Sequence, residues 1–205
     1  MIPERFVTEY PRRCGELLAL LEQQARGKQL VGSFALLVAS AAFTIPFGRM
    51  TENDHLLGRP EREPSLAIKQ LKKCQFLEAP FWGGIKLDFF RYARIVNDNA
   101  ENAGQWRDVN DEHPIRSTET KDANAILRVV RNALAHGNIV YLDRQGRETP
   151  GNQLRYLAFL SRHDDNTSYR VAIFREEGFL TFVKAWIQWV QKFPPEHEHV
   201  FEEVA

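Results

Sequence analysis

The sequence predicts an α+β protein, mainly helical, in which an antiparallel helical bundle precedes a small three-stranded antiparallel sheet and a C-terminal helix. Apolar residues recur at helical spacing through much of residues 1–137. Three later segments are instead rich in branched and aromatic residues and are separated by turn formers. With 205 residues, we expect a single domain: a bundle in 1–137, the sheet and last helix in 138–193, and a short tail in 194–205.

The first two elements are predicted to form a helical hairpin. Residues 12–26 carry an apolar stripe and should form an amphipathic helix that ends at Gly27. Residues 30–47 contain no charge and reach the lower length limit for a membrane-spanning helix. Because glycine, serine, threonine and proline dilute this stretch, we interpret it as a helix buried in the bundle.

The middle of the chain is predicted to alternate loops with short helices. Pro46, Gly48 and residues 51–64 indicate a loop, after which Ser65 is a candidate N-cap for a third helix. Residues 86–95, KLDFFRYARI, are predicted to form a short aromatic-rich helix. Residues 97–122 are poor in apolar side chains and are expected to form a long acidic surface loop.

The C-terminal half has the clearest pattern. A helix is predicted from about Asp122 to a stop at Gly137. Three strands follow, at residues 139–143, 154–161 and 169–174, and should form an antiparallel meander. The last helix has an apolar stripe that includes Trp186, whose ring we expect to be buried.

Composition limits the function classes. The 27 basic and 27 acidic residues balance, so a nucleic acid could be bound only through a local basic patch. Cys14 and Cys74 have no metal-site or redox-motif spacing, and together with the charged N-terminal segment they favour a cytosolic protein without membrane attachment. No nucleotide-hydrolase or zinc-protease motif occurs, and His197 and His199 are interpreted as part of a solvated tail, so we expect no metal or other cofactor.

One segment carries chemistry: residues 131–138, RNALAHGN, at the end of a predicted helix. An ordinary surface arginine followed by a histidine that caps the last carbonyls would give the same pattern. On an ideal helix Arg131 and His136 point about 140° apart, whereas Asn132 and His136 share a face. The pair could converge if the helix frays, if the arginine wraps round, or if a second copy of the chain supplies the missing partner.

The RNALAHG segment resembles the signature of the HEPN superfamily, in which an arginine, a polar residue, a spacer and a histidine lie near the end of a long helix. The apolar hairpin ending in IPF, the FWGG and LDFFRYARI stretches, and the sheet followed by a helix are similar to a plasmid-borne bacterial HEPN subfamily, over most of the chain. In toxins of this superfamily that pair with nucleotidyltransferase antitoxins, a tyrosine stands two residues past the histidine. Asn138 occupies that position here, so that pairing is not expected.

The resemblance implies a homodimer in which two motif helices face each other and both copies of Arg131 and His136 line one cleft. It also implies metal-independent RNA cleavage in a toxin or phage-defence system, with an antitoxin as a further partner. His136 would transfer protons, Arg131 would hold the phosphate, and Asn132 would orient the imidazole or bind the phosphate. The motif helix is expected to expose Asn124 and Ala135 toward the second copy.

A basic patch for RNA is also predicted. Lys69, Lys72 and Lys73 share one helix face and are predicted to form this patch together with Arg91 and Arg94. Arg128, one turn before Arg131, is a further candidate RNA-binding residue. An ordinary solvated helix face would have the same pattern. Two functions therefore remain open: an RNA endonuclease, and a catalytically inactive HEPN dimer that binds RNA or regulates another protein.

Overall fold

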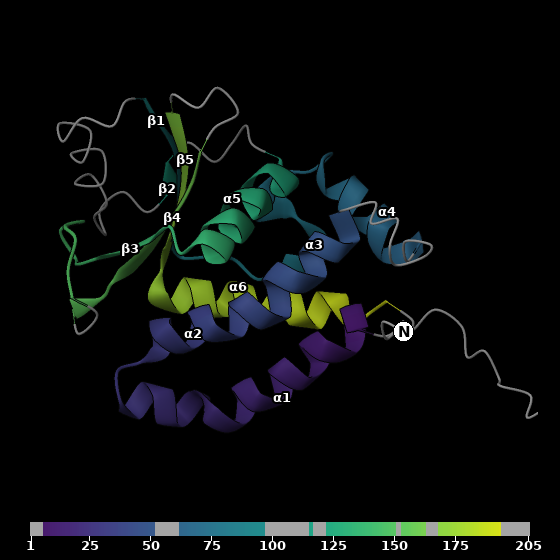
Figure 1. The fold of residues 1–205 in the computed structure, drawn as a ribbon, viewed down its shortest axis with the longest axis horizontal. Coiled ribbons are helices and arrows are strands. Elements are labelled where there is room, and N and C mark those ends of the chain that lie inside the picture. Colours follow the sequence, from purple (N-terminus) through teal and green to yellow (C-terminus); the bar gives the residue numbers. More distant parts are fainter. Residues whose placement is uncertain are drawn as a thin grey trace, which may run out of the picture.

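The computed structural model describes residues 6–51, 62–96, 115–116, 122–150, 153–162 and 168–193, and it shows a mixed α+β fold that is mainly helical (Figure 1). Helix α1 (Phe6–Gly27) turns at residues 28–30 into α2 (Val31–Ala39). The two helices contact each other and form the predicted hairpin. Helix α1 starts six residues before the predicted residue 12, and Pro11 lies inside it.

Helix α2 continues through a π-helical turn, η1 (Ser40–Thr44), into α3 (Ile45–Thr51). The predicted loop at Pro46 and Gly48 is therefore wrong, since both residues are helical and buried. Pro46 has no N–H to donate to the carbonyl four residues earlier, that of Ala42. The indole N–H of Trp186 donates to this carbonyl instead, at 3.1 Å, which compensates for the proline.

Residues Val31–Thr51 are long and apolar enough to cross a membrane by length and composition, and 56% of the most apolar window is buried inside the protein. The remainder of that helix borders solvent and the site described below. The helix was expected to be buried in the bundle, and only part of its surface is buried.

Helix α4 and two 3-10 turns come next in the described chain. Helix α4 (Arg62–Leu71) begins before Ser65, so the predicted N-cap lies within the helix. The 3-10 turns η2 (Phe76–Glu78) and η3 (Pro80–Trp82) carry aromatic side chains into the core. Gly83 and Gly84 end this region with positive φ angles of 58° and 90°, a conformation that glycine adopts without steric cost.

The sheet has the order β2-β1-β5-β4-β3 and differs from the predicted three-stranded sheet. Strands β3 (Ile139–Leu142), β4 (Tyr156–Arg162) and β5 (Ser168–Arg175) form the predicted antiparallel meander. Strand β1 (Phe90–Val96) adds a fourth antiparallel strand beside β5, and the two-residue β2 (Ile115–Arg116) runs parallel to β1. Apart from β2 and Asp122, the predicted acidic loop lies outside the described residues, as does the predicted tail.

The predicted helix over residues 86–95 is wrong because this segment alternates as a strand does. Phe90 pairs with Phe174 of β5 in the ladder, and their rings lie 4.8 Å apart on the helix-covered face of the sheet. Phe89 contributes to a smaller buried cluster that includes Tyr156 and Ile173. Neighbouring side chains on opposite faces are the period-2 pattern of a strand buried on both sides.

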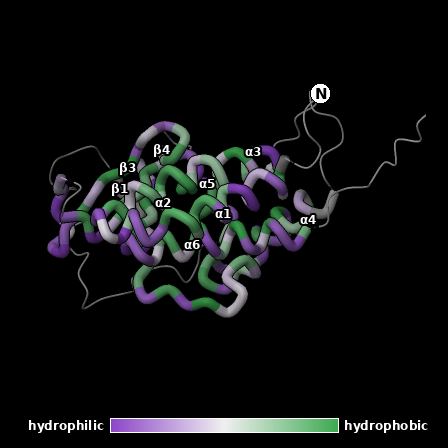
Figure 2. Tube along the Cα trace, turned by 90° about the horizontal axis from the view of Figure 1, so that it is seen from below, coloured by the Kyte–Doolittle hydropathy of each residue, from purple (hydrophilic) through white to green (hydrophobic). Residues whose placement is uncertain are grey.

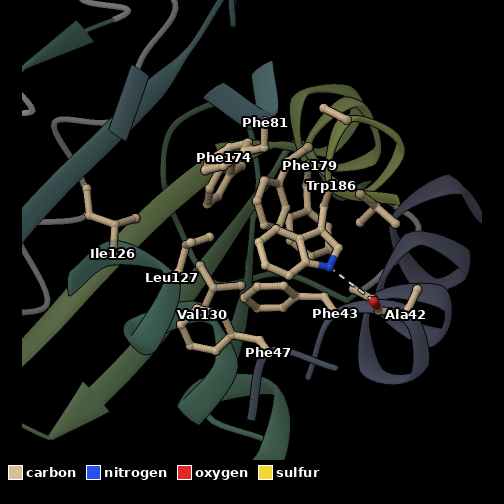
Figure 3. Packing of buried hydrophobic residues seen from close by; sticks show 14 of the residues in the cluster. Ala42, Phe43, Phe47, Phe81, Ile126, Leu127, Val130, Phe174, Phe179 and Trp186 are labelled. Carbon is tan, nitrogen blue, oxygen red and sulfur yellow. Dashed lines mark hydrogen bonds between the residues drawn. The ribbon is translucent and has the colours of Figure 1, made fainter. Parts of the chain in front are cut away.

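Helices α5 (Ala123–His136) and α6 (Glu176–Val190) pack on the sheet, and α6 also contacts α1 and α2 (Figure 1). Trp186 is fully buried, as predicted, with its ring 4.9 Å from that of Phe43 and 5.9 Å from that of Phe47 (Figure 3). Figure 2 shows the hydrophobic colour concentrated on central elements such as α2 and α6. Cys14 and Cys74 are free thiols, and burial raises the pKa of both.

Candidate functional site

The site is built on helix α5, whose two ends are fixed by local chemistry. The carboxylate of Asp122 caps the first turn by accepting the backbone N–H of Ala125 at 2.8 Å. Gly137 ends the helix with φ 72°, and its N–H donates to the carbonyl of Ala133. One face of α5 buries an apolar stripe against the core: Ala123, Ile126, Leu127, Val129, Val130 and Ala133. The opposite face is left for polar side chains.

A pocket of about 440 Å³ lies between α3, α4 and α5. It gathers five of the seven predicted site residues: Lys69, Lys72, Arg128, Arg131 and Asn132. The sequence analysis assigned these to two groups, catalytic residues and an RNA-binding patch, and the structure brings the two groups into one pocket. The remaining lining residues are Phe47, Met50, Thr51, Ile68 and Asn124.

The charge of this pocket has one sign. Lys69 of α4, Lys72 just after α4 and two arginines of α5 line it, and none of the described lining residues is a carboxylate. Amides and one hydroxyl supply the other polar groups. A concave surface of this kind attracts anions, and paired arginines match the geometry of a phosphate group.

Arg131 and Asn132 are held in a defined arrangement. The guanidinium of Arg131 donates to Asn132 Oδ1 at 3.2 Å, and Asn132 Nδ2 lies 3.2 Å from the hydroxyl oxygen of Ser161 on β4. Ser161 is buried, so the end of β4 fixes the position of the Asn132 amide. The Arg131 guanidinium also passes close to Gly48, where an added Cβ would lie 3.5 Å from Nη2.

His136 and Lys73 lie elsewhere. His136 is exposed in the last turn of α5 and is not among the lining residues of the pocket. Lys73 is exposed just after α4 and is likewise absent from the lining. Within one protomer the described pocket therefore contains the arginine and the amide of the motif without its histidine.

The residues exposed on the outer face of α5 agree only in part with those predicted to be exposed. Ala135 is exposed, as predicted, and so is Arg128. The expected exposure of Asn124 is wrong, because its side chain is 7% exposed and lines the pocket. Helical periodicity explains this position: Asn124 lies four residues before Arg128 and eight before Asn132, which places all three on the face that borders α3 and α4.

Sequence reasoning missed seven residues of the site: the lining residues Phe47, Met50, Thr51, Ile68 and Asn124, and Gly48 and Ser161, which lie against Arg131 and Asn132. For Ser161 a signal existed, since it alternates with Leu157 and Phe159 and so shares their inward-facing side of β4. No comparable signal placed α3 opposite α5, because that pairing depends on how the whole bundle packs.

The described residues were expected to offer no metal site. Among the described residues, no group of three or more histidine, cysteine, aspartate or glutamate side chains is arranged to hold a metal ion. The chemistry that the described site offers is thus recognition of an anion by arginine, lysine and amide groups, beside an exposed histidine. Comparison with known proteins finds no family model, no curated protein and no solved structure that matches this chain.

Proposed function

We propose that this protein is a metal-independent RNA endonuclease of the HEPN type, in a toxin or phage-defence system, that cleaves at a composite site between two copies of the chain. The observation that carries the proposal is the pocket that joins Arg131 and Asn132 of the motif to Arg128, Lys69 and Lys72. Four cations, with no carboxylate among the described lining residues, form a site suited to the RNA backbone.

The second support is the position of His136. It stands at the exposed end of α5, on the opposite edge of the outer helix face from Arg131. Exposed Ala135 lies between these edges, and its small side chain allows another helix to approach closely. A two-fold contact along this face would bring the histidine of each copy toward the arginine pocket of the other.

The chemistry follows from these groups. An imidazole can remove the proton of a ribose 2′-hydroxyl or protonate a leaving 5′-oxygen, the general acid–base role proposed for His136. The 2′-oxygen attacks the adjacent phosphorus, the P–O5′ bond breaks, and the products are a 2′,3′-cyclic phosphate and a 5′-hydroxyl. Arg131 stabilises the charge that develops on the phosphoryl oxygens, and Asn132 holds Arg131 in place.

Cleavage of a defined single-stranded RNA in the presence of EDTA tests this proposal. We expect His136→Ala and Arg131→Ala each to lower the rate by about 10²- to 10⁴-fold, the usual contribution of a general acid or base. Arg144→Ala, an exposed arginine in the turn after β3, is the matched control and should cleave normally. An all-deoxy strand should stay intact, because it lacks the attacking hydroxyl.

Light scattering supplies the second arm of the test. The active species should have about twice the mass of one 23.7 kDa chain. Full activity of a monomer, equal cleavage of the deoxy strand, or full activity of both alanine variants would contradict the endonuclease.

The alternative is a catalytically inactive dimer that binds RNA or regulates another protein. One observation favours it: the cationic pocket lies within a single protomer and does not include His136, so it can bind an anion without that histidine. RNA binding that depends on Arg131 but not on His136, with no cleavage by the wild-type protein, would select this alternative.

A further inference from the structure

Asn124 is the polar group of the pocket that the proposed chemistry does not use. It lies in the first turn of α5, lines the pocket and is 7% exposed. Its carboxamide has no hydrogen-bond partner among the described residues, and it is not one of the polar groups that are shut off from solvent, so the amide is open to the pocket. A ligand in the pocket would replace solvent as the donor and acceptor for this amide.

The surroundings of Asn124 are divided in polarity. Phe47, Met50 and Ile68 contribute apolar surface to the same pocket. Along α5, Arg128 follows Asn124 by one turn and Arg131 by two, about 6 Å and about 10 Å along the helix axis. The pocket thus combines an amide, an apolar wall and separate cations. A ligand that matches them has a flat hydrogen-bonding ring at one end and a negative charge at the other.

A nucleotide has this distribution of groups, and the volume of about 440 Å³ is within the range of small-ligand sites. A carboxamide pairs with a base edge that offers an amino donor beside a ring-nitrogen acceptor. Adenine presents such an edge on both its Watson–Crick and its Hoogsteen side, whereas cytosine presents one on its Watson–Crick side alone, and asparagine is a common partner for adenine. The base must be unstacked to enter, which requires single-stranded RNA.

We propose that the pocket holds one adenosine nucleotide of a single-stranded RNA, with the base read by Asn124 and the phosphate paired with Arg128 and Arg131. The inference rests on the proposed function for the identity of the strand. It adds that cleavage occurs next to an adenosine, because the base pocket and the motif arginine share one cavity.

Binding of mononucleotides, measured by calorimetry on the full-length protein without any RNA, tests the pocket separately from catalysis. We expect 5′-AMP to bind about tenfold to a hundredfold more tightly than ribose 5-phosphate and 5′-UMP, the usual value of a bidentate base contact. Two analogues test the hydrogen bonds without any mutation: purine riboside 5′-phosphate lacks the 6-amino group, and 7-deaza-AMP lacks N7. At least one of them should lose most of the advantage of AMP over ribose 5-phosphate.

Variants locate the effect. Asn124→Leu, of similar size, should lose the preference for AMP and keep the affinity for ribose 5-phosphate, whereas Arg128→Ala should weaken both. Asn138→Leu is the matched control, since Asn138 is exposed after α5 and does not line the pocket. Thermal melting reports whether each variant is folded, and the analogues decide the question if Asn124→Leu is not.

The two proposals fail in different ways. Equal affinity for AMP and ribose 5-phosphate, or an AMP preference that Asn124→Leu leaves intact, would overturn the base pocket whatever the RNA assay shows. An AMP preference that depends on Asn124, in a protein that cleaves no RNA, would uphold the base pocket and overturn the endonuclease.

Discussion

Phe47 borders two regions of the molecule that are built in different ways. On one side its ring packs beside Phe43 and Trp186 in the aromatic core, where the indole N–H has a carbonyl partner (Figure 3). On the other side it lines the cationic pocket, where the Asn124 amide has no partner within the described chain. One helix, Val31–Thr51, contributes to both regions.

The aromatic core stabilises the fold, whereas the cationic pocket has the groups needed to recognise a ligand. Burial of aromatic rings gives the core a large favourable free energy, and the buried indole N–H of Trp186 costs little because it is hydrogen-bonded. The pocket gathers four cations, whose mutual repulsion lowers stability unless an anion is bound. Local departures from good packing and pairing are expected at binding sites rather than in cores.

The core should give the largest effect on stability. Trp186→Ala should lower the free energy of unfolding by about 3 to 5 kcal/mol, because it removes a fully buried ring and leaves the Ala42 carbonyl without the indole donor. Urea denaturation followed by circular dichroism measures this. Leu20→Ala, at a position that is 71% exposed on α1, is the control and should change stability by less than about 0.5 kcal/mol. Equal midpoints for the two variants would contradict the fold described above.

The pocket should give the opposite result. Arg131→Ala should weaken binding of a short single-stranded RNA by about tenfold to a hundredfold, the value of a charge-assisted hydrogen bond, and should change unfolding by no more than about 1 kcal/mol. Fluorescence anisotropy with a labelled RNA and the same urea titration give the two numbers. If Arg131→Ala destabilises the protein as much as Trp186→Ala, the distinction between core and pocket is wrong.

The elements that build the core could largely be predicted from the sequence, whereas the pocket could not. The caps of α5 at Asp122 and Gly137, the apolar stripe of α6 and the meander strands all have local patterns, and the structure confirms them. Strand β1 was predicted as a helix because a short aromatic-rich segment buried on both faces cannot be told from a buried helix by its local pattern, and the ladder to β5 decides between them. Pairing between distant segments overrides local propensity in such cases.

The site could be predicted residue by residue but not as a pocket. Arg131, Asn132, Lys69 and Lys72 were chosen for their chemistry and their spacing along two separate helices. Their convergence depends on the angle at which α4 meets α5, and no pattern within either helix specifies it. Asn124 was expected on the outer face because sequence alone does not show which neighbouring elements cover a helix.

A smaller effect is expected where α6 begins. The Glu176 carboxylate accepts the N–H of Gly32 at the start of α2, and burial raises the pKa of this group, an effect that the hydrogen bond partly offsets. A raised pKa in the folded state means that stability from this group is complete at acidic pH, below the unfolded pKa, and declines as pH rises through the folded pKa.

Glu176→Gln keeps an oxygen that can accept the Gly32 N–H but cannot ionise. It should therefore be more stable than the wild type at neutral pH, by less than about 1 kcal/mol, and the gain should vanish near pH 4. Unfolding at a series of pH values measures this. Glu78→Gln, an exposed glutamate, is the control and should show no such trend. A loss of stability at neutral pH would show that the charge itself is needed at the start of α2.

The smallest effect is expected at the surface between α1 and α6. Glu22 contacts Lys184 at 2.6 Å and Arg26 at 2.8 Å, and the hydrogen bond from Lys184, followed by that from Arg26, lowers the pKa of Glu22. This contribution is present above the unfolded pKa and is lost as pH falls through the folded pKa. Glu22→Gln should cost at most about 0.5 kcal/mol at neutral pH, and less in 1 M salt, since exposed pairs are screened. A cost that is unchanged by salt would mean that packing, not charge, is responsible.

The hydrogen bond between Trp186 and Ala42 has a consequence for how α6 is aligned on the hairpin. Contacts among aromatic and aliphatic side chains are non-directional, so they alone would tolerate α6 displaced by one turn along its neighbour. A hydrogen bond has a defined direction and needs an acceptor without an intrahelical partner. Pro46 is the only proline in residues 31–51, and it leaves one such acceptor at one place. Pro46 thus adds one directional contact, at one place along the helix, to the apolar packing of α6 against residues 31–51.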